Sequence, residues 1–546
     1  MSDREREAWV ESTLTKLSLE EKTGQLFMIT FAGTQISQEL LDFLLGHHFG
    51  GVTVGGGNIS SPEQITALNL GLQKAYQEAG KPPLLVSVTQ EGGIVTRWHY
   101  PATVVPSAMA IAATGSIELA GECAELTARE LRAAGFNINF APTVDVNNNP
   151  LNPVIGTRSY GEIPGQAARY GVAAIEGQRR AGIASCAKHF PGHGDTSVDS
   201  HFGLPVIPYD LARLEEVELA PFRAAIAAGV EMVMTAHILF PALDDRTPAT
   251  LSRTVLTGLL RERLGYDGLI VTDSMTMEAI AANFDLGEAA VQALEAGADI
   301  ILTGGDIRTQ AYMYQAVLKA VQVGRLSVQQ FEGSVRRVLG LKWDLEVRRG
   351  QDLAGQEMVP PAQEWPFPEH LTLAREAARR SITLIRDRDG LVPLPLDSGR
   401  GLAIIEFRLI RFSLVEEARR TSRYLRELFE RRYPDVGYLT LDPSPSVEEK
   451  EAARQVAAAA DMLVVATRNA NVYQEQASLV KELLASGKPI VVLAIRNPFD
   501  LDAIPEVGTY LVTYGDAPVS LEAAVECLFG DSRPRGRAPI TLIGAD

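Results

Sequence analysis

Short apolar runs alternate with longer amphipathic segments through roughly the first 340 residues. Uninterrupted apolar runs of this length are typical of parallel strands that are buried on both faces. The longer segments, such as 116–134, 165–181 and 211–228, carry apolar residues at helical spacing. Eight strand-then-helix units predict an α/β fold, a (β/α)8 barrel. The predicted strands are 26–31, 50–54, 84–88, 138–141, 184–188, 232–235, 269–272 and 300–302.

The periodicity fails around residues 344–371, and the segment 358–368 contains four prolines. A proline-rich segment between two periodic regions is expected to link two domains. Upstream of the first strand, Ser18 and Glu21 form the pattern of a capping box that opens a helix. The predicted domains are a barrel over 1–345, a linker over 346–372 and a sandwich over 373–546.

A second alternating series follows the proline-rich segment. Helical segments such as 446–460 and 474–486 lie between its apolar runs, which predicts a doubly wound αβα sandwich of about 170 residues. Neither a G-x-G-x-x-G pattern nor a P-loop occurs there, so nucleotide binding has no support. The predicted strands are 402–406, 437–441, 462–466, 490–495 and 510–513.

Composition narrows the class of protein. The 546 residues are 46% hydrophobic and 22% charged, as in globular proteins with more than one domain. The net charge of −17 argues against nucleic acid or an anionic membrane as a partner. The start lacks the apolar core of a signal peptide, and no stretch approaches the roughly 20 apolar residues of a membrane span. With three scattered cysteines, the chain is expected to be cytoplasmic and without a disulfide framework.

The segment 188–201, Lys-His-Phe-Pro-Gly-His-Gly-Asp-Thr-Ser-Val-Asp-Ser-His, gathers titratable side chains. It holds three of the 8 histidines, with two aspartates and a lysine. It begins at the end of the predicted strand 184–188, where the chain leaves the barrel. A loop at a strand end accommodates polar titratable groups that a packed core excludes. The segment therefore predicts a functional site.

Other strand exits also carry chemistry. In a (β/α)8 barrel, the active site lies where the strands end and their following loops begin. Because consecutive exits carry charged or polar side chains, they can converge on one pocket. These exit residues are Thr89 and Arg97 after the third strand, Asp145 and Arg158 after the fourth, Lys188 and His189 at the fifth, His237 after the sixth, and Asp273 and Met277 after the seventh.

Asp273 directly follows the strand pattern Gly-Leu-Ile-Val-Thr at 268–272, which would hold its carboxylate rigidly at the barrel mouth. Taken alone, an aspartate at this position is more often the cap of the next helix. Opposite a loop that carries histidine and aspartate, it becomes a candidate nucleophile.

Asp199 and His201 lie two residues apart on the loop. A carboxylate beside an imidazole orients the ring and favours its protonated form, as a general acid near neutral pH requires. An isolated Asp-x-His would instead indicate an Asx-type turn with a solvated histidine. A metal centre is disfavoured because the spacing of His189, His193 and Asp195 with this pair matches no zinc pattern. We expect neither a metal nor a cofactor.

Four side chains are candidate donors to a multiply hydroxylated substrate: Arg97, Arg158, Lys188 and His189. The alternative is surface salt bridges for the three cations and a buried, hydrogen-bonded ring for His189. His237 suits either substrate contact or support of a neighbour, and His193 can hold the loop together through hydrogen bonds.

Six motifs occur together in order along most of the first 340 or so residues. They are Gln-Glu-Gly-Gly at 90–93, Asn-Phe-Ala-Pro at 139–142 with Asp-Val-Asn-Asn-Asn-Pro at 145–150, Lys-His-Phe-Pro-Gly-His-Gly-Asp-Thr at 188–196, Asp-Ser-His at 199–201, Met-Thr-Ala-His at 234–237 and Val-Thr-Asp-Ser at 271–274. In this order they resemble glycoside hydrolase family 3, and within it the bacterial β-N-acetylglucosaminidases. The second half is similar only in style to the αβα domain that some members append.

The resemblance implies a retaining double displacement on terminal β-linked N-acetylhexosamine, from cell-wall fragments or chitooligosaccharides. Asp273 matches the family's nucleophile, and His201 with Asp199 matches its acid/base dyad. Most retaining glycosidases use two carboxylates, so an imidazole acid departs from that rule. A neutral imidazole adds no second negative charge beside the nucleophile. It would also let an anion such as phosphate approach, so phosphorolysis is an alternative outcome.

The resemblance does not identify the sugar, because one sugar-binding position differs from the family pattern. Arg158, Lys188 and His189 match sugar-contacting positions, and Arg97 is assigned with them. Thr89 stands where the family usually has an aspartate that binds sugar hydroxyls, and Ile94 where it often has arginine. Threonine offers no bidentate carboxylate, so either the glycone differs from N-acetylglucosamine or a neighbour replaces the contact. A β-glucosidase and a catalytically degenerate sugar-binding protein therefore stay as alternatives.

Overall fold

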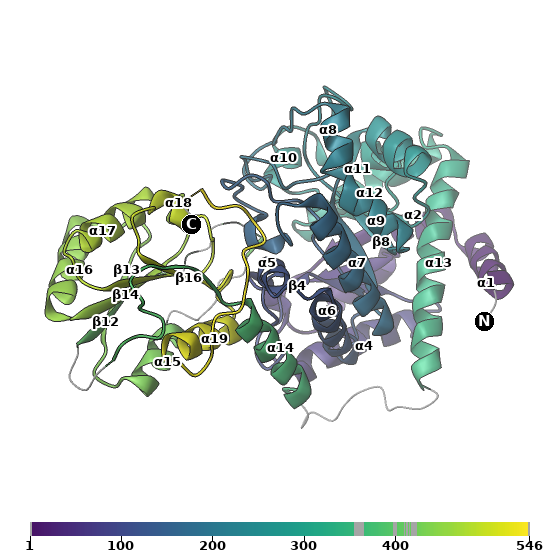
Figure 1. Ribbon diagram of the computed structural model, residues 1–546. Helices are drawn as coiled ribbons and strands as arrows, with labels where there is room; N and C mark the ends of the chain where they lie inside the picture. The colour runs from purple at the N-terminus through teal and green to yellow at the C-terminus, as the bar shows by residue number, and fades with distance from the viewer. Residues whose placement is uncertain are drawn as a thin grey trace.

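The structure is a computed structural model that describes residues 3–353, 365–396, 401–408, 410, 413, 415–416 and 423–543. Figure 1 shows a barrel surrounded by helices and a smaller sheet domain beside it. The predicted order, a (β/α)8 barrel followed by an α/β domain, is confirmed.

The barrel is a single sheet of eight parallel strands, in the order β10-β1-β2-β3-β6-β7-β8-β9. A parallel backbone bridge between Val271 and Ile300 joins the two ends of this order, so the sheet closes on itself. All eight predicted strands are present, because each apolar run is buried between the barrel interior and the outer helices. The strands are β1 (Phe27–Thr30), β2 (Gly51–Val54), β3 (Leu85–Val88), β6 (Ile138–Asn139), β7 (Ala184–Phe190), β8 (Met232–Thr235), β9 (Leu269–Val271) and β10 (Ile301–Leu302).

Helices cover the outside of the barrel (Figure 1). The predicted capping box is confirmed, since Ser18 and Glu21 exchange side-chain-to-backbone hydrogen bonds at the start of a helix. The predicted helix at 211–228 is two helices, because Pro221 has no N–H to donate to the Val217 carbonyl. The helices are α1 (Asp3–Lys16), α2 (Leu19–Gln25), α3 (Gln38–Gly46), α4 (Pro62–Glu78), α5 (Ala108–Ala113), α6 (Ile117–Ala133), α7 (Pro164–Arg180), α8 (Leu211–Glu216), α9 (Leu219–Ala227), α10 (Glu278–Ala281), α11 (Leu286–Ala296), α12 (Ile307–Gln322) and α13 (Val328–Leu353).

The second domain has a six-stranded sheet in the order β11-β16-β15-β14-β12-β13. All five predicted strands are present and pair in parallel, and an additional strand, β11, pairs antiparallel at one edge. The strands are β11 (Thr383–Asp387), β12 (Leu402–Phe407), β13 (Gly437–Leu441), β14 (Met462–Thr467), β15 (Ile490–Ala494) and β16 (Thr509–Val512). The helices are α14 (Pro368–Ser381), α15 (Tyr424–Arg432), α16 (Val447–Ala459), α17 (Gln474–Leu484), α18 (Asp500–Ala503) and α19 (Pro518–Leu528).

The two domains share an apolar core. Helix α14 packs against α19 of its own domain and against α5 and α6 of the barrel. One cluster of buried side chains includes Ile111 and Leu119 from the barrel with Ala378 and Val519 from the second domain. The predicted linker falls partly on residues 354–364, which lie outside the described residues, so its boundaries stay a prediction.

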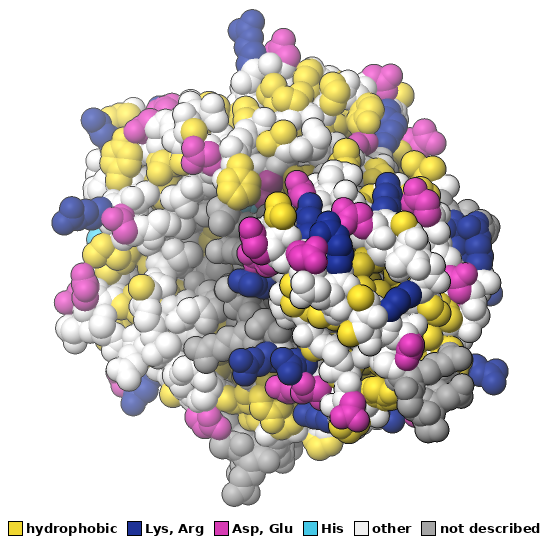
Figure 2. Space-filling view, turned by 90° about the vertical axis from the view of Figure 1, so that its left-hand side faces the viewer, with side chains coloured by type: hydrophobic (Ala, Val, Ile, Leu, Met, Phe, Trp, Pro, Cys, Tyr) yellow, Lys and Arg dark blue, Asp and Glu magenta, His cyan; other side chains and the backbone are white. Residues whose placement is uncertain are grey.

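Within the described residues, no helix combines the length and the apolar character needed to cross a bilayer. Figure 2 views the molecule from the side of the second domain, where acidic and basic side chains lie intermixed on the coloured surface. The negative net charge is therefore not gathered into one patch over the described part of this face.

Candidate active site

A cavity of about 510 Å³ is lined by residues from the carboxyl ends of the barrel strands. The structure brings most of the predicted site residues onto its wall, and Asp145, Asp199 and His237 lie behind it. Apolar side chains such as Phe31 and Phe140 complete the wall. The predicted residues that line the cavity are Thr89, Arg97, Arg158, Lys188, His189, His201, Asp273 and Met277.

Asp273 lies two residues after the end of β9 and is partly exposed in the cavity. It does not cap the next helix, since the N-cap of α10 is Met277. Its Oδ1 instead accepts a hydrogen bond from the Ser274 N–H at 2.7 Å. Although desolvation acts to raise the pKa of Asp273, the nearby imidazoles of His189, His237 and His201 lower it below its ordinary value. The carboxylate is therefore ionised at neutral pH.

His201 is held by Asp199 on the loop that follows β7. Asp199 Oδ1 accepts from the His201 N–H at 2.9 Å, and His201 Nδ1 lies 2.6 Å from the same oxygen. The Asx-type turn and the Asp199/His201 pair, which the sequence presented as alternatives, are therefore both present. The turn orients the imidazole ring. Burial acts to raise the pKa of Asp199, but hydrogen bonds from His201 and Ser413 lower it to about 2. The contact with Asp199 uses His201 Nδ1, so Nε2 is the ring nitrogen that does not face Asp199.

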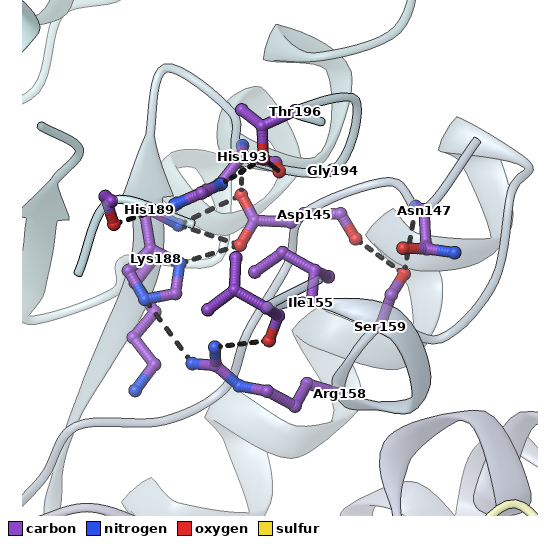
Figure 3. A network of polar contacts seen from close by, with 12 residues as sticks. Asp145, Asn147, Ile155, Arg158, Ser159, Lys188, His189, His193, Gly194 and Thr196 are labelled. Carbon is purple, nitrogen blue, oxygen red and sulfur yellow. Dashed lines mark hydrogen bonds and ion pairs between the residues drawn. The ribbon is translucent and has the colours of Figure 1, made fainter. Parts of the chain in front are cut away.

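The loop is braced by His193 (Figure 3). The His193 N–H donates to Asp145 Oδ1 at 2.7 Å, and its ring contacts Thr196 Oγ1 and Ser200 Oγ at 2.9 and 3.2 Å. Burial, with the charge of His189, lowers the pKa of His193 to about 4, so this ring is neutral at neutral pH. Gly194 is required next to it, because a Cβ there would lie 1.7 Å from the Val146 carbonyl oxygen.

Asp145 supports His189 and does not line the cavity. Its carboxylate accepts the His189 N–H at 3.1 Å and lies 2.8 Å from the His189 Nδ1 (Figure 3). Desolvation acts to raise the pKa of Asp145, and the neighbouring histidines, His189 first, lower it. With 1% of its surface exposed, Asp145 fixes the orientation of His189, whose ring lines the cavity.

Glu91 is a site residue that sequence reasoning missed. Arg158 donates two hydrogen bonds to its carboxylate at 2.8 and 2.9 Å, and the Lys188 Nζ lies 2.7 Å from Glu91 Oε1. All three side chains are buried, with 1–7% exposed. Burial acts to raise the pKa of Glu91, but the two cations lower it far below its usual range. The Gln-Glu-Gly-Gly motif contains this residue. Nothing in the motif indicates that its glutamate pairs with Arg158 and Lys188, which come much later in the sequence.

Replacing Glu91 with glutamine is expected to lower the free energy of unfolding by about 3–5 kcal/mol, because two buried cations lose their counter-charge. Urea titration of the variant and the parent protein measures this. The exposed Glu78→Gln, which loses only a surface contact with Lys74, is the matched control and should change stability by less than about 1 kcal/mol. Equal unfolding midpoints for Glu91→Gln and the parent would mean that the triad does not stabilise the fold.

His237 is buried behind the turn that carries Asp273. Its Nδ1 lies 2.8 Å from Thr250 Oγ1 and its Nε2 lies 3.0 Å from the Ser274 carbonyl oxygen. Both ring nitrogens therefore have partners in the protein, and desolvation lowers the pKa of His237. Of the two roles that the sequence leaves open, the geometry favours support of the Asp273 turn.

The second domain also reaches the cavity. Val415, which comes after β12 in the chain, lines the cavity, and its carbonyl oxygen accepts a hydrogen bond from Arg97 Nη1 at 2.7 Å. Ser413 Oγ donates to Asp199 Oδ2 at 2.6 Å. Sequence reasoning did not predict these contacts, since they join segments more than 200 residues apart.

Two family models together cover nearly the whole chain. Residues 18–341 match the glycosyl hydrolase family 3 N terminal domain, and residues 276–545 match the glycosyl hydrolase family 3 C-terminal domain. The chain belongs to glycoside hydrolase family 3. The predicted family, and with it a glycoside hydrolase, is confirmed.

Individual family 3 proteins are similar over different lengths. A β-hexosaminidase A from Pseudoalteromonas piscicida is 36% identical over 66% of this chain, which spans 63% of that relative's length. A β-N-acetylglucosaminidase/β-glucosidase from Cellulomonas fimi is 30% identical, with 98% of this chain and 95% of the relative covered. A solved family 3 β-N-acetylglucosaminidase from Paenibacillus sp. str. FPU-7 superposes with a TM-score of 0.91 at 39% identity, over 97% of this chain and 100% of that one.

Proposed function

We propose that this family 3 enzyme is a retaining exo-β-N-acetylglucosaminidase that removes terminal β-linked N-acetylhexosamine through a covalent glycosyl-enzyme. The observation that carries the proposal is one cavity lined by both Asp273 and His201, with the imidazole held by Asp199. The names of the Cellulomonas fimi and Paenibacillus relatives, both β-N-acetylglucosaminidases, support the N-acetylglucosaminide as substrate.

In the first step, Asp273 attacks the anomeric carbon as the bond to the leaving oxygen breaks. His201 transfers the Nε2 proton to that oxygen, so the aglycone departs as a neutral alcohol. The electron pair of the broken bond stays on the leaving oxygen, and the sugar becomes an ester of Asp273. Asp199 is ionised through this step because the hydrogen bonds from His201 and Ser413 keep its pKa low despite burial.

In the second step, the now neutral His201 takes a proton from water, and the hydroxyl oxygen attacks the anomeric carbon from the face opposite Asp273. The ester bond breaks, the carboxylate of Asp273 is regenerated, and His201 holds the proton for the next turnover. Two inversions at one carbon give net retention of the β configuration.

The remaining wall of the cavity suits sugar hydroxyls. Lys188 Nζ is paired with Glu91 on one side and lines the cavity on the other, and His189 and Arg97 lie on the same wall. Most donors of Arg158 are used within the protein, on Glu91 and on the Val154 carbonyl oxygen. We therefore assign Lys188, His189 and Arg97 as the direct donors. Arg158 helps to fix two of them, since it shares Glu91 with Lys188 and its Nη2 lies 3.4 Å from His189 Nε2.

Two features favour phosphorolysis as a second candidate. Asp273 and Glu278 are the carboxylates among the described residues that line the cavity. A neutral imidazole base adds no further negative charge beside Asp273, so the approach of an anion is less hindered than with a carboxylate as the base. A solved β-glucoside phosphorylase superposes at a TM-score of 0.84 with 25% identity. Because Thr89 lines the cavity where the family usually has an aspartate, a β-glucoside is an alternative substrate.

A panel of 4-nitrophenyl β-glycosides that differ only in the sugar, assayed with and without inorganic phosphate, separates these outcomes. We expect the highest kcat/KM on the N-acetylglucosaminide, with free N-acetylglucosamine as product in both conditions. Faster cleavage of the glucoside would overturn the sugar assignment, and a phosphate-dependent sugar 1-phosphate would overturn hydrolysis. Binding without turnover of any glycoside would indicate a degenerate sugar-binding protein.

Cell-wall fragments and chitooligosaccharides are the proposed natural substrates, since both present terminal β-linked N-acetylhexosamine. We also propose a cytoplasmic location. Its support is that Cys123, Cys186 and Cys527 are free and buried, as is usual in proteins of reducing compartments.

A further inference from the structure

A hydrogen bond from the second domain reaches the dyad of the barrel. Ser413, in the loop that follows β12, donates its Oγ–H to Asp199 Oδ2 at 2.6 Å. Both residues are buried, with 2% and 5% exposed. We propose that Ser413 is a positioning residue for the general acid, so that the second domain completes the catalytic site. This proposal rests on the proposed function, in which His201 is the acid.

The two oxygens of Asp199 have different partners. Oδ1 holds the backbone N–H and the ring Nδ1 of His201, whereas Oδ2 is held by Ser413. With both oxygens engaged, the carboxylate is prevented from rotating about its Cβ–Cγ bond. Removal of the Ser413 hydroxyl would leave a buried charged oxygen without this donor, and a rotated carboxylate would no longer hold the His201 ring in place.

Ser413 is anchored to the sheet of its own domain. Its backbone N–H donates to Glu416 Oε1 at 3.2 Å, and its carbonyl oxygen accepts from the Glu416 N–H at 3.1 Å. Glu416 in turn accepts a hydrogen bond from Arg496 Nη1 at 2.7 Å, and Arg496 follows β15. Because the Glu416 and Arg496 side chains are only 5% and 11% exposed, the pair is a buried anchor for the loop.

The same loop fixes a second group on the cavity wall. The Val415 carbonyl oxygen holds Arg97, and the shared apolar core keeps the two domains in a fixed relation. Ser413 and Val415, two residues apart, therefore hold Asp199 and Arg97, respectively. The residue that orients the dyad thus lies outside the barrel that carries the dyad.

The test is whether the effect of Ser413→Ala on kcat/KM depends on the leaving group of the substrate. We expect kcat/KM on N,N′-diacetylchitobiose, whose leaving group needs protonation, to fall roughly tenfold, as for loss of one hydrogen bond to a charged group. On the 2,4-dinitrophenyl glycoside, which needs no proton, kcat/KM should stay within about twofold of the parent. Ser413→Thr keeps the hydroxyl and should restore activity on the disaccharide.

Ser520→Ala is the matched control, since Ser520 is a buried serine of the same domain whose Oγ has no hydrogen-bond partner among the residues that the structure describes. It should leave kcat/KM on both substrates unchanged. Equal losses on both substrates for Ser413→Ala, or no loss on either, would overturn the positioning role.

A double variant separates this inference from the proposed function. If Ser413 acts through His201, adding Ser413→Ala to His201→Ala should cause no further loss on the disaccharide. A further tenfold loss would overturn the inference. If His201→Ala itself reduced kcat/KM equally on both substrates, the assignment of His201 as the acid in the proposed function would fail instead.

Discussion

Replacing Asp273 with alanine is expected to reduce turnover of 4-nitrophenyl β-N-acetylglucosaminide by a factor on the order of 10⁴ or more, as for removal of an enzyme nucleophile. Without the carboxylate, no covalent intermediate forms, and a good leaving group does not compensate. Stability should be nearly unchanged, because Asp273 is partly exposed and its one hydrogen bond to protein is to the Ser274 N–H among the contacts of the described residues. Initial rates and urea unfolding of the purified variant measure both quantities.

Azide distinguishes a missing nucleophile from a damaged site. An anion of this size can enter the space left by the Asp273 carboxylate and attack the anomeric carbon, so azide should restore turnover and give the α-glycosyl azide. Asp195→Ala is the matched control, because Asp195 lies on the dyad loop and contacts Arg213 outside the cavity. It should retain activity within about tenfold, which is far from the loss expected at Asp273. Unchanged hydrolysis by a folded Asp273→Ala protein would refute the nucleophile.

Replacing His201 with alanine is expected to lower kcat/KM for N,N′-diacetylchitobiose by about 10²–10⁴-fold, the usual contribution of a general acid. For the 2,4-dinitrophenyl glycoside the loss should be within about threefold, because this leaving group departs without a proton. The second step still needs a base, so kcat on the activated substrate should fall while its kcat/KM is retained. Steady-state rates on the two substrates measure the contrast.

Asp199→Asn tests whether the imidazole acts with its carboxylate. The amide keeps the shape of the side chain but removes the charge that faces His201 Nδ1. As with His201→Ala, kcat/KM should fall on N,N′-diacetylchitobiose and be largely retained on the 2,4-dinitrophenyl glycoside. The loss on the disaccharide should be smaller than for His201→Ala. A His201→Ala protein that lost both activities in proportion would show that His201 is not the acid.

The barrel was predictable because each of its strands is an apolar run with a helix after it. The runs at 232–235 and 269–272, for example, correspond to strands in which every residue is buried. The edge strand β11 was not predictable in the same way. Its sequence, Thr-Leu-Ile-Arg-Asp, is polar at three of five positions, and its pairing with β16 is antiparallel at the edge of the sheet, where burial imposes little pattern.

The candidate site could be proposed from the sequence where its residues lie close together or beside a strand pattern. Asp199 and His201 lie two residues apart, and Asp273 directly follows the apolar run at 268–272, so their types and positions were visible directly. Glu91 and Ser413 were not found, because each acts on residues that only the fold brings near. Arg158, which follows β6, and Lys188, on β7, meet Glu91, which follows β3, and Ser413 meets Asp199 across a domain boundary.

The most direct test of the mechanism is to trap the sugar on the protein. A 5-fluoro N-acetylglucosaminyl fluoride combines a good leaving group with a ring fluorine that slows both steps, so the intermediate should accumulate. Peptide mass spectrometry after brief exposure and acid quenching is expected to find one added fluorinated sugar on the peptide that contains Asp273, and none in Asp273→Ala. A sugar attached to another residue, or turnover of the reagent with no attached sugar at any time, would contradict a covalent intermediate on Asp273.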